Sequence, residues 1–236
     1  SYLSKKYNLK TINDNCHSMG SKINNNIGYA VKYADIVTHS YHPVKAITTG
    51  EGGSLLTNIK KYDLISKKLR THSIVRKENN IFDYDVDNLG YNYRITDFQC
   101  ALGSEQIKRL NKFVKKKRGI ASIYDKEFSK HPLITTPKIK KNYYHSYHLY
   151  PLRIDFELAK IKKEKFINTL KKKGYNLQVH YKPIHFFKYH KDKVEFDKNK
   201  LKFSKIFFKQ EISLPIFYEL KNFQIYKLIS LIKKLI

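Results

Sequence analysis

One lysine of this chain, Lys45, lies between two segments that restrict the backbone. The run Tyr-His-Pro at 41–43 precedes it, and a glycine-rich turn at 50–53 follows it and leads into an apolar strand. Proline fixes its own φ angle, and glycine permits tight turns that other residues avoid. A lysine amine in such a rigid setting can form a Schiff base with an aldehyde. The stretch 40–53 therefore predicts covalent chemistry at Lys45.

The charge of the chain is strongly positive but spread along its length. The 236 residues carry a formal net charge of +27, and lysine pairs and triplets recur from 67–68 to 233–234. Such a composition is typical of an A+T-rich genome, in which lysine fills solvated helix faces, although a positive field also suits a phosphate-rich substrate. A basic nucleic-acid-binding module is the last-ranked alternative, because the aromatic residues show no regular interleaving with basic ones. We expect no nucleic-acid partner.

The cysteines and the apolar runs limit the class of protein further. Cys16 and Cys100 are the two cysteines, and they lie far apart without metal-ligand spacing, so we expect two buried thiols and no metal site. No apolar run approaches the roughly 20 residues that span a bilayer. The start of the sequence shows no signal-peptide pattern. We therefore expect a cytoplasmic protein that has no membrane partner.

The N-terminal half alternates between strand and helix patterns. The expected strands are 10–13, a second within 29–38, and 53–58. The expected helices are 60–73 and a long or broken helix that begins after Thr96 as N-cap and continues to 124. The polar stretch 77–90 predicts a long loop. This alternation favours an α/β class with two lobes.

The pattern changes at about Leu133 to shorter strands and helices. Strands are expected at 148–154 and 176–180. An amphipathic helix is expected at 161–173, with Gly174 as its C-terminal cap, and the last helix at 223–236. The C-terminal part is therefore predicted to be a smaller α/β unit.

Three further residues could complete a pyridoxal phosphate (PLP) site around Lys45. Asp14 ends an expected buried strand, where a carboxylate can keep the ring nitrogen protonated, but it also suits a helix N-cap or a turn. The Ser40 hydroxyl could bind the cofactor phosphate or be an ordinary strand-end serine. His17 could lie beside the ring or be structural, and a structural role is favoured for His42.

Three ordered motifs together resemble the DegT/DnrJ type of sugar aminotransferases. They are His-Ser-Met-Gly at 17–20, the lysine motif at 40–53, and Gly-Tyr-Asn-Tyr-Arg-Ile-Thr-Asp at 90–97. The match continues through 101–110, 179–185 and 212–216, so the resemblance covers essentially the whole chain. It implies the α/β fold type I of PLP-dependent transferases. Residues 1–118 would be the C-terminal part of the large PLP-binding domain, and 119–236 the small C-terminal α/β domain.

The resemblance also implies a role for each candidate residue of the large domain. Lys45 would be the catalytic Schiff-base lysine, which also moves the proton, and Asp14 would be the partner of the pyridinium nitrogen. His17 would contact the cofactor, and Ser40 would bind its phosphate. Asn92 would reach the cofactor phosphate of the second subunit in a homodimer.

On the substrate side, the resemblance implies contacts from Arg94, His180, Tyr181 and His185, each of which also allows a structural role. The substrate would be a nucleotide-linked 4-keto sugar and the amino donor glutamate, in the biosynthesis of cell-surface sugars. The dehydratase branch of the family is disfavoured, because histidine occupies the lysine position there.

The matching region begins midway through the large lobe of the family. The part before it supplies backbone amides to the phosphate and an aromatic face to the ring, and helix N-terminal amides are a main source of phosphate affinity. We therefore expect an exposed sheet edge and an incomplete cofactor pocket in these 236 residues. The alternative to an active aminotransferase is an inactive truncated remnant or a non-catalytic homologue.

Overall fold

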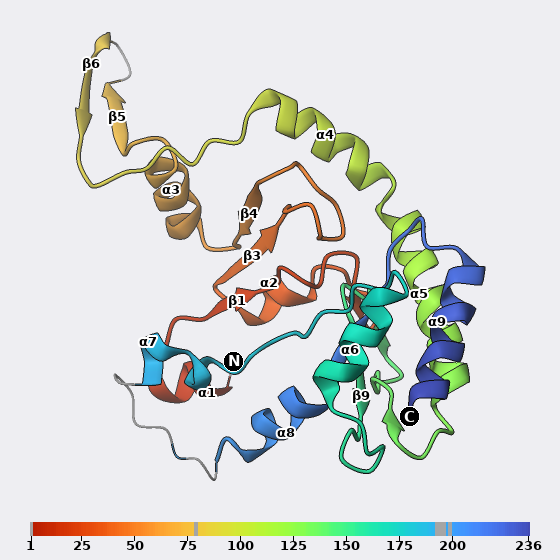
Figure 1. Cartoon of the computed structure of the whole chain (residues 1–236). Coiled ribbons are helices and arrows are strands. Elements are labelled where there is room, and N and C mark those ends of the chain that lie inside the picture. Colours follow the sequence, from red (N-terminus) through yellow and green to blue (C-terminus); the bar gives the residue numbers. More distant parts are fainter. Residues whose placement is uncertain (1, 78–79, 192–196, 198–199) are drawn as a thin grey trace. The chain divides into compact units, whose positions relative to one another are not determined.

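The computed structural model describes residues 2–77, 80–191, 197 and 200–236 (Figure 1). Contacts divide the chain into two compact units. The N-terminal unit comprises Ser1–Val114 and Lys141–Ser146, and the C-terminal unit comprises Lys115–Lys140 and Tyr147–Ile236. Both contain helices and strands, as the α/β pattern predicted. The predicted domain boundary between residues 118 and 119 stays a prediction. The compact units themselves separate between residues 114 and 115, with 141–146 returning to the first unit.

The N-terminal unit contains a three-stranded sheet of strand order β1-β3-β4. Strand β1 (Ile12–Asp14) runs parallel to β3 (Ile36–Ser40), and β3 pairs on its other side with antiparallel β4 (Gly53–Leu56). The register places Asp14 opposite Thr38. Strands β1 and β3 therefore end at the same edge of the sheet, which is where parallel sheets present their functional side chains.

Two secondary-structure predictions for this unit are wrong. Residues Tyr29–Tyr33 form helix α2 rather than the start of a strand, because a short apolar run fits either structure. The stretch after residue 77 contains no long loop among its described residues: β5 (Ile74–Lys77) and β6 (Asn80–Val86) form an antiparallel hairpin. Alternating aromatic residues at Phe82 and Tyr84 were the strand signal within that polar stretch.

The helices of this unit follow the predicted pattern more closely. Helices α3 (Lys60–Leu69) and α4 (Asp97–Lys108) and the start of α5 (Leu110–Phe128) lie where helices were predicted. A further short helix of this unit is α1 (Tyr2–Tyr7). Thr96 caps α4 in a reciprocal capping box with Gln99, and a break at Arg109 separates α4 from α5. Both the N-cap and the broken helix are as predicted. A short ladder of β2 (Lys22–Ile23) with β8 (Tyr143–Tyr144) adds residues from later in the chain.

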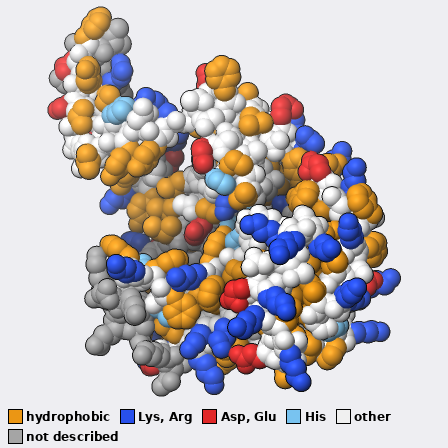
Figure 2. Space-filling view, in the orientation of Figure 1, with side chains coloured by type: hydrophobic (Ala, Val, Ile, Leu, Met, Phe, Trp, Pro, Cys, Tyr) orange, Lys and Arg blue, Asp and Glu red, His pale blue; other side chains and the backbone are white. Residues whose placement is uncertain are grey.

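The prediction of two buried thiols is wrong for both cysteines. Cys16 is half-buried, whereas Cys100 is exposed. Cys100 lies in α4, which has no buried residue in this chain, so no helix face there excludes water. On the face shown in Figure 2, lysine and arginine side chains are spread among other residues, as expected for dispersed charge.

The C-terminal unit is built on an antiparallel sheet of strand order β10-β9-β7. Its strands are β7 (Ile134–Thr135), β9 (Tyr150–Ile154) and β10 (Glu211–Leu214). Its helices are the rest of α5, α6 (Lys163–Lys172), the short η1 (Ile184–Phe186) and α7 (Lys188–Lys191), α8 (Lys202–Gln210) and α9 (Asn222–Leu235). One continuous apolar cluster joins α5, α6, α9 and the sheet, with Tyr124, Phe166 and Ile225 almost fully buried.

Gly174 ends α6 as predicted. Its φ angle is +88°, the Tyr175 N–H donates to the Leu170 carbonyl at 3.0 Å, and the Gly174 N–H donates to the Lys171 carbonyl at 2.9 Å. These two bonds form a Schellman motif, which satisfies carbonyl groups at the helix end.

The strand predicted at 176–180 is reduced to a single bridge between Gln178 and Ser213. Continuing the antiparallel register would place His180 opposite Glu211. The His180 N–H instead donates to the Glu211 side chain at 2.9 Å, so the backbone ladder stops there. The prediction was wrong because a side chain replaced the next backbone partner.

Replacing Phe166 by alanine tests the C-terminal core. Phe166 is fully buried and packs edge-on against Phe156, with ring centroids 5.3 Å apart. We expect Phe166→Ala to lower the free energy of unfolding by about 3–5 kcal/mol, because a buried aromatic ring is lost and a cavity remains. Denaturant unfolding of the whole chain measures this. Lys165→Ala is the matched control on an exposed position of α6 and should change stability by less than about 0.5 kcal/mol.

Candidate active site

The candidate site begins where β1 and β3 end. Asp14 is the last residue of β1 and Ser40 the last of β3, so the pairing brings both to one edge of the sheet. The prediction that β1 is a buried strand is wrong for this chain: its three residues are exposed, and Ile12 keeps 69% of its surface. Among the described residues only β3 pairs with β1, which leaves the other edge of β1 uncovered.

Local hydrogen bonds and nearby positive charges keep Asp14 ionised. Hydrogen bonds from the Cys16 side chain and backbone lower the pKa of the Asp14 carboxyl, and the positive charges of His17 and Lys45 act in the same direction. The backbone bond, from Cys16 N–H to Asp14 Oδ1, is 3.1 Å long. An exposed, ionised carboxylate is the group required opposite a protonated ring nitrogen.

Lys45 lies in a loop that is closed by backbone hydrogen bonds. The Lys45 N–H donates to the His42 carbonyl at 2.9 Å. At the base of the loop, the Thr49 N–H donates to the Tyr41 carbonyl at 3.0 Å, and the Tyr41 N–H donates to the Gly52 carbonyl at 2.8 Å. The Lys45 side chain is half-buried, and its charge acts on Asp14. The loop thus holds the amine within electrostatic range of the carboxylate.

Two glycines are required for the chain to return from this loop into β4. A Cβ on Gly53 would lie 2.6 Å from the His39 carbonyl oxygen, which is a backbone atom that cannot move away. Gly52 has a φ of +151°, and a Cβ there would lie 2.5 Å from Thr49 Oγ1. The glycine-rich turn that the sequence showed is therefore a steric requirement of β3–β4 pairing beside the lysine loop.

The loop is also anchored on the helices of the same unit. Ile47, two residues after the lysine, is buried in a cluster with Leu110 and Val114 of α5. Gly103 of α4 faces Thr49, whose Cγ2 would lie 2.9 Å from an added Cβ. These contacts hold the lysine loop against α4 and α5.

The remaining cofactor-side candidates lie near the strand ends. Ser40 is half-buried, and its Oγ accepts a long hydrogen bond of 3.4 Å from the His42 N–H. His17 is exposed, and its charge acts on Asp14. The His42 ring takes part in the turn, because its Nδ1 accepts the Val44 N–H at 3.3 Å, and the structural role favoured for it stays a prediction.

Sequence reasoning missed Asn15, which ties the strand ends together. Its backbone N–H donates to the Thr38 carbonyl at 3.0 Å, and its side-chain amide lies 3.0 Å from His39 Nε2. The Tyr29 hydroxyl donates to the side-chain oxygen Oδ1 of Asn15 at 3.4 Å. Asn15 is buried, and its position directly after Asp14 was the only signal in the sequence.

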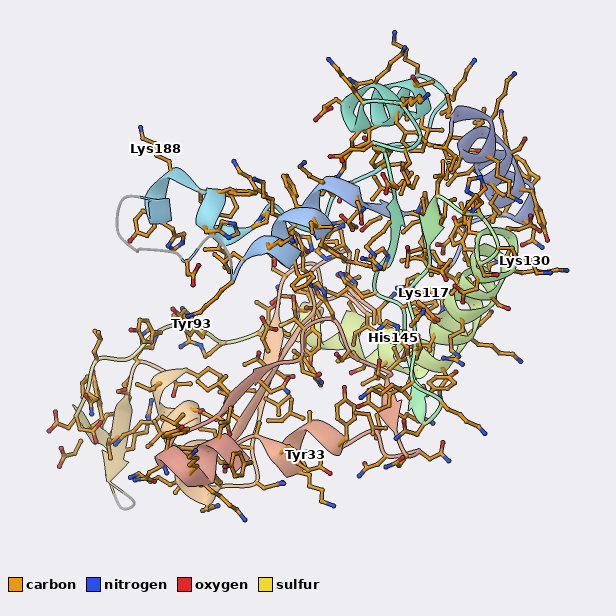
Figure 3. All side chains as sticks on the ribbon, turned by 90° about the horizontal axis from the view of Figure 1, so that it is seen from below. Tyr33, Tyr93, Lys117, Lys130, His145 and Lys188 are labelled. Carbon is orange, nitrogen blue, oxygen red and sulfur yellow. The ribbon has the colours of Figure 1, made fainter. Side chains whose placement is uncertain are left out.

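Asn92 and Arg94 lie on an extended segment held by the end of α3. The Tyr91 N–H donates to the Leu69 carbonyl at 2.7 Å, and Asn92 bridges to Thr71. Figure 3 shows Tyr93 on this segment, and its ring stacks on that of Tyr91 with centroids 4.8 Å apart. The side chains of Asn92 and Arg94 are exposed on this single chain.

The other substrate-side candidates belong to the C-terminal unit. His180 is half-buried, and its ring meets that of Tyr181 edge-on, with centroids 4.6 Å apart. Tyr181 is 60% exposed, and His185 is half-buried in η1. The structure therefore groups Asp14, Ser40 and Lys45 in one unit and His180 with Tyr181 in the other.

The residues that the structure describes contain no group of three or more His, Cys, Asp or Glu residues that could hold a metal ion. Among the same residues, every helix is too short or too polar to cross a membrane.

The fold is the α/β fold type I of PLP-dependent transferases, as the sequence predicted. A family model of DegT/DnrJ/EryC1/StrS aminotransferases matches residues 1–233, and the chain belongs to this family.

Two relatives with the same printed name are similar to most of this chain. The chain is 40% identical over 221 residues to a UDP-4-amino-4,6-dideoxy-N-acetyl-beta-L-altrosamine transaminase of Campylobacter jejuni, a match covering 93% of this chain and 57% of that protein. A Helicobacter pylori protein of the same name is 33% identical over 215 residues, covering 90% of this chain and 55% of that protein. The chain thus spans little more than half the length of these relatives.

Solved structures agree with this likeness. Helicobacter pylori PseC, described as an aminotransferase of pseudoaminic acid biosynthesis, matches with a TM-score of 0.89 and 30% identity over 99% of this chain and 61% of that one. The PLP form of a sugar aminotransferase, Spr1654 of Streptococcus pneumoniae, matches with a TM-score of 0.83 and 25% identity over 100% of this chain and 61% of that one. Membership of this family implies PLP as the cofactor.

Removing the charge of Lys45 should raise the pKa of Asp14. The Lys45 ammonium is one of the groups that hold this pKa below its usual range, so Lys45→Met should move the carboxyl titration to higher pH. Because the pKa is lowered in the folded state, ionised Asp14 stabilises the fold above its unfolded-state pKa, and this contribution is lost as the pH falls through the folded-state value. An NMR titration of the Asp14 carboxyl carbon measures the shift. Lys32→Met removes an equal charge from α2 and should leave the titration unchanged.

Adding a methyl group at Gly53 should disrupt the turn behind Lys45. We expect Gly53→Ala to destabilise the chain by about 1–3 kcal/mol, because the new Cβ meets the His39 carbonyl. Gly28→Ala is the control, since its Cβ would meet only the Asn26 side chain at an ordinary 3.4 Å. Denaturant unfolding compares the two, and equal stability of both variants would contradict this account of the glycine turn.

Proposed function

We propose that this chain belongs to a PLP-dependent aminotransferase that aminates a nucleotide-linked 4-keto sugar, with glutamate as the amino donor. The observation that carries the proposal is the placement of Lys45. Its amine lies on a closed loop beside the ends of β1 and β3, close enough for its charge to act on the ionised Asp14. A lysine and a carboxylate so placed are what PLP chemistry requires of a protein.

The residues at the strand ends fit PLP chemically. The exposed Asp14 carboxylate can accept a hydrogen bond from the protonated ring nitrogen. Ser40 Oγ accepts the His42 N–H, which leaves the hydroxyl proton free to be donated to a phosphate oxygen. When bound, PLP supplies an electron sink for the carbon that carries the amino group.

The chain's own residues then have separate tasks. Lys45 Nζ would bind the cofactor aldehyde at rest and, once released, would carry a proton as a general base and acid. Asp14 would keep the ring nitrogen protonated through its negative charge. Asn15 and the glycine turn hold these two side chains in place, because they fix the strand ends and the loop base.

A homodimer would complete the site. We infer that Asn92 reaches the cofactor phosphate of the second subunit, because its backbone is pinned to Thr71 while its side chain is exposed. His17 would contact the cofactor from the same chain as Lys45. Arg94, His180, Tyr181 and His185 would contact the substrate, although they lie in different parts of the chain.

The substrate class follows the named relatives. The segments 40–53, 70–74 and 179–185 favour the branch that carries the altrosamine transaminase name, and the relatives with this name are 40% and 33% identical to the chain. We therefore propose a UDP-linked 4-keto sugar of the pseudaminic acid pathway, processed in the cytoplasm for cell-surface polysaccharide. An inactive remnant is less favoured, because Lys45, Asp14 and Ser40 are all retained.

Covalent labelling by PLP tests the lysine assignment. The chain is incubated with PLP, reduced with borohydride and mapped by peptide mass spectrometry, both alone and within the longest product of its gene. We expect PLP on Lys45 in preference to other lysines, and no label there in Lys45→Ala. Lys32→Ala, which removes an exposed lysine of α2, is the matched control and should keep the Lys45 label.

Two results would separate the alternatives. Labelling of Lys45 only in the longer product would place the rest of the phosphate site outside these 236 residues. Labels spread evenly over surface lysines in both products would favour the non-catalytic homologue.

A further inference from the structure

A buried carboxylate in the C-terminal unit is not explained by the apolar core. Glu211 opens β10 and is completely buried, and Ser213 of the same strand is 7% exposed. Residues two apart on a strand point to the same face, so both side chains are directed to one side of the sheet. Burying a carboxylate is costly unless its oxygens are hydrogen-bonded, which requires specific partners.

The partners of Glu211 converge on one histidine. Glu211 Oε2 accepts the His180 backbone N–H at 2.9 Å, and Glu211 Oε1 accepts the Ser213 hydroxyl at 2.7 Å. Ser213 Oγ in turn lies 2.8 Å from His180 Nδ1. The carboxylate thus holds His180 twice, directly through its backbone and through Ser213 at its ring.

The donors and acceptors in the hydrogen bonds among Glu211, Ser213 and His180 determine the tautomer of His180. A carboxylate only accepts hydrogen bonds, and a serine hydroxyl has one proton to donate. Because Ser213 donates that proton to Glu211, its oxygen can only accept from His180 Nδ1. Nδ1 must therefore carry the proton, and the lone pair of the neutral ring is left on Nε2.

The surroundings of both groups agree with this assignment. The negative charge of Glu211 acts on Lys163, opposing the burial that lowers the pKa of that lysine. The His180 ring meets the Tyr181 ring edge-on and is only half-buried, so part of it stays accessible. Among the described residues, no hydrogen-bond partner occupies Nε2.

We propose that Glu211 and Ser213 are positioning residues that lock His180 in its Nδ1–H form and present Nε2 as a hydrogen-bond acceptor to a ligand. A neutral ring in this form binds hydroxyl and N–H groups, and it disfavours phosphate oxygens and carbonyls, which are acceptors themselves. The assignment of the ligand rests on the proposed function. In that function, His180 Nε2 accepts a hydrogen bond from a hydroxyl or amide N–H group of the substrate. The tautomer itself does not depend on that function.

The whole chain labelled with ¹⁵N-histidine tests the tautomer directly. Two-bond ¹H–¹⁵N correlation at alkaline pH, where histidine is neutral, distinguishes protonated from unprotonated ring nitrogens. We expect His180 to show a protonated Nδ1 and an unprotonated Nε2. His131 is the internal reference with the opposite pattern, because its Nδ1 accepts the Leu133 N–H at 3.3 Å.

An isosteric substitution of the carboxylate should reverse the tautomer. In Glu211→Gln the His180 N–H still requires an acceptor, so the amide NH₂ must face Ser213 and donate to its oxygen. Ser213 then donates to His180 Nδ1, and the ring proton moves to Nε2. Ser213→Ala should release the lock, whereas Ser213→Thr, which keeps the hydroxyl, should retain the wild-type pattern and provides a second variant if Glu211→Gln does not fold.

A protonated Nε2 in the wild-type chain, or an unchanged pattern in folded Glu211→Gln, would overturn the proposal. Folding of each variant is judged from an unchanged His131 signal. The measurement uses neither PLP nor substrate, so its failure is distinct from a failure to label Lys45.

Discussion

The parallel pairing of β1 with β3 is the constraint on which the candidate site depends. Its register fixes Asp14 opposite Thr38, so that the carboxylate lies beside the strand end from which the lysine loop departs. A slip of one residue would turn the Asp14 side chain to the other face of the sheet. The contacts of buried Asn15 with Thr38 and His39 extend this register beyond the last residue of β1 and oppose such a slip.

In both units, buried or hydrogen-bonded groups position a half-buried polar side chain. In the N-terminal unit, backbone hydrogen bonds and Ile47 anchor the loop that carries Lys45. In the C-terminal unit, Glu211 lies fully buried at the start of β10 and binds the segment that carries His180. The stable cores thus define the direction of side chains that are themselves half-buried, which is the arrangement expected of a preorganised site.

Local sequence patterns were sufficient to predict those features of the fold that depend on residues close together in the chain. The Thr96 cap, the break between α4 and α5 and the Gly174 helix end were all predicted, because each is made by residues within a few positions of one another. The hairpin after Ile74 and the lost strand at 176–180 were missed. The first depends on pairing between two weak strand segments, and the second on a side chain 31 positions away.

The sequence by itself determined the family and the candidate lysine, because Lys45, its glycine turn and the later motifs have an order and spacing that few families share. Only the tertiary structure decided which polar groups support them. Asn15 and Glu211 have no distinctive motif, and their importance comes from burial against partners distant in the chain. Burial makes an unpaired polar group costly, so the fold must supply those partners, and a linear pattern does not reveal them.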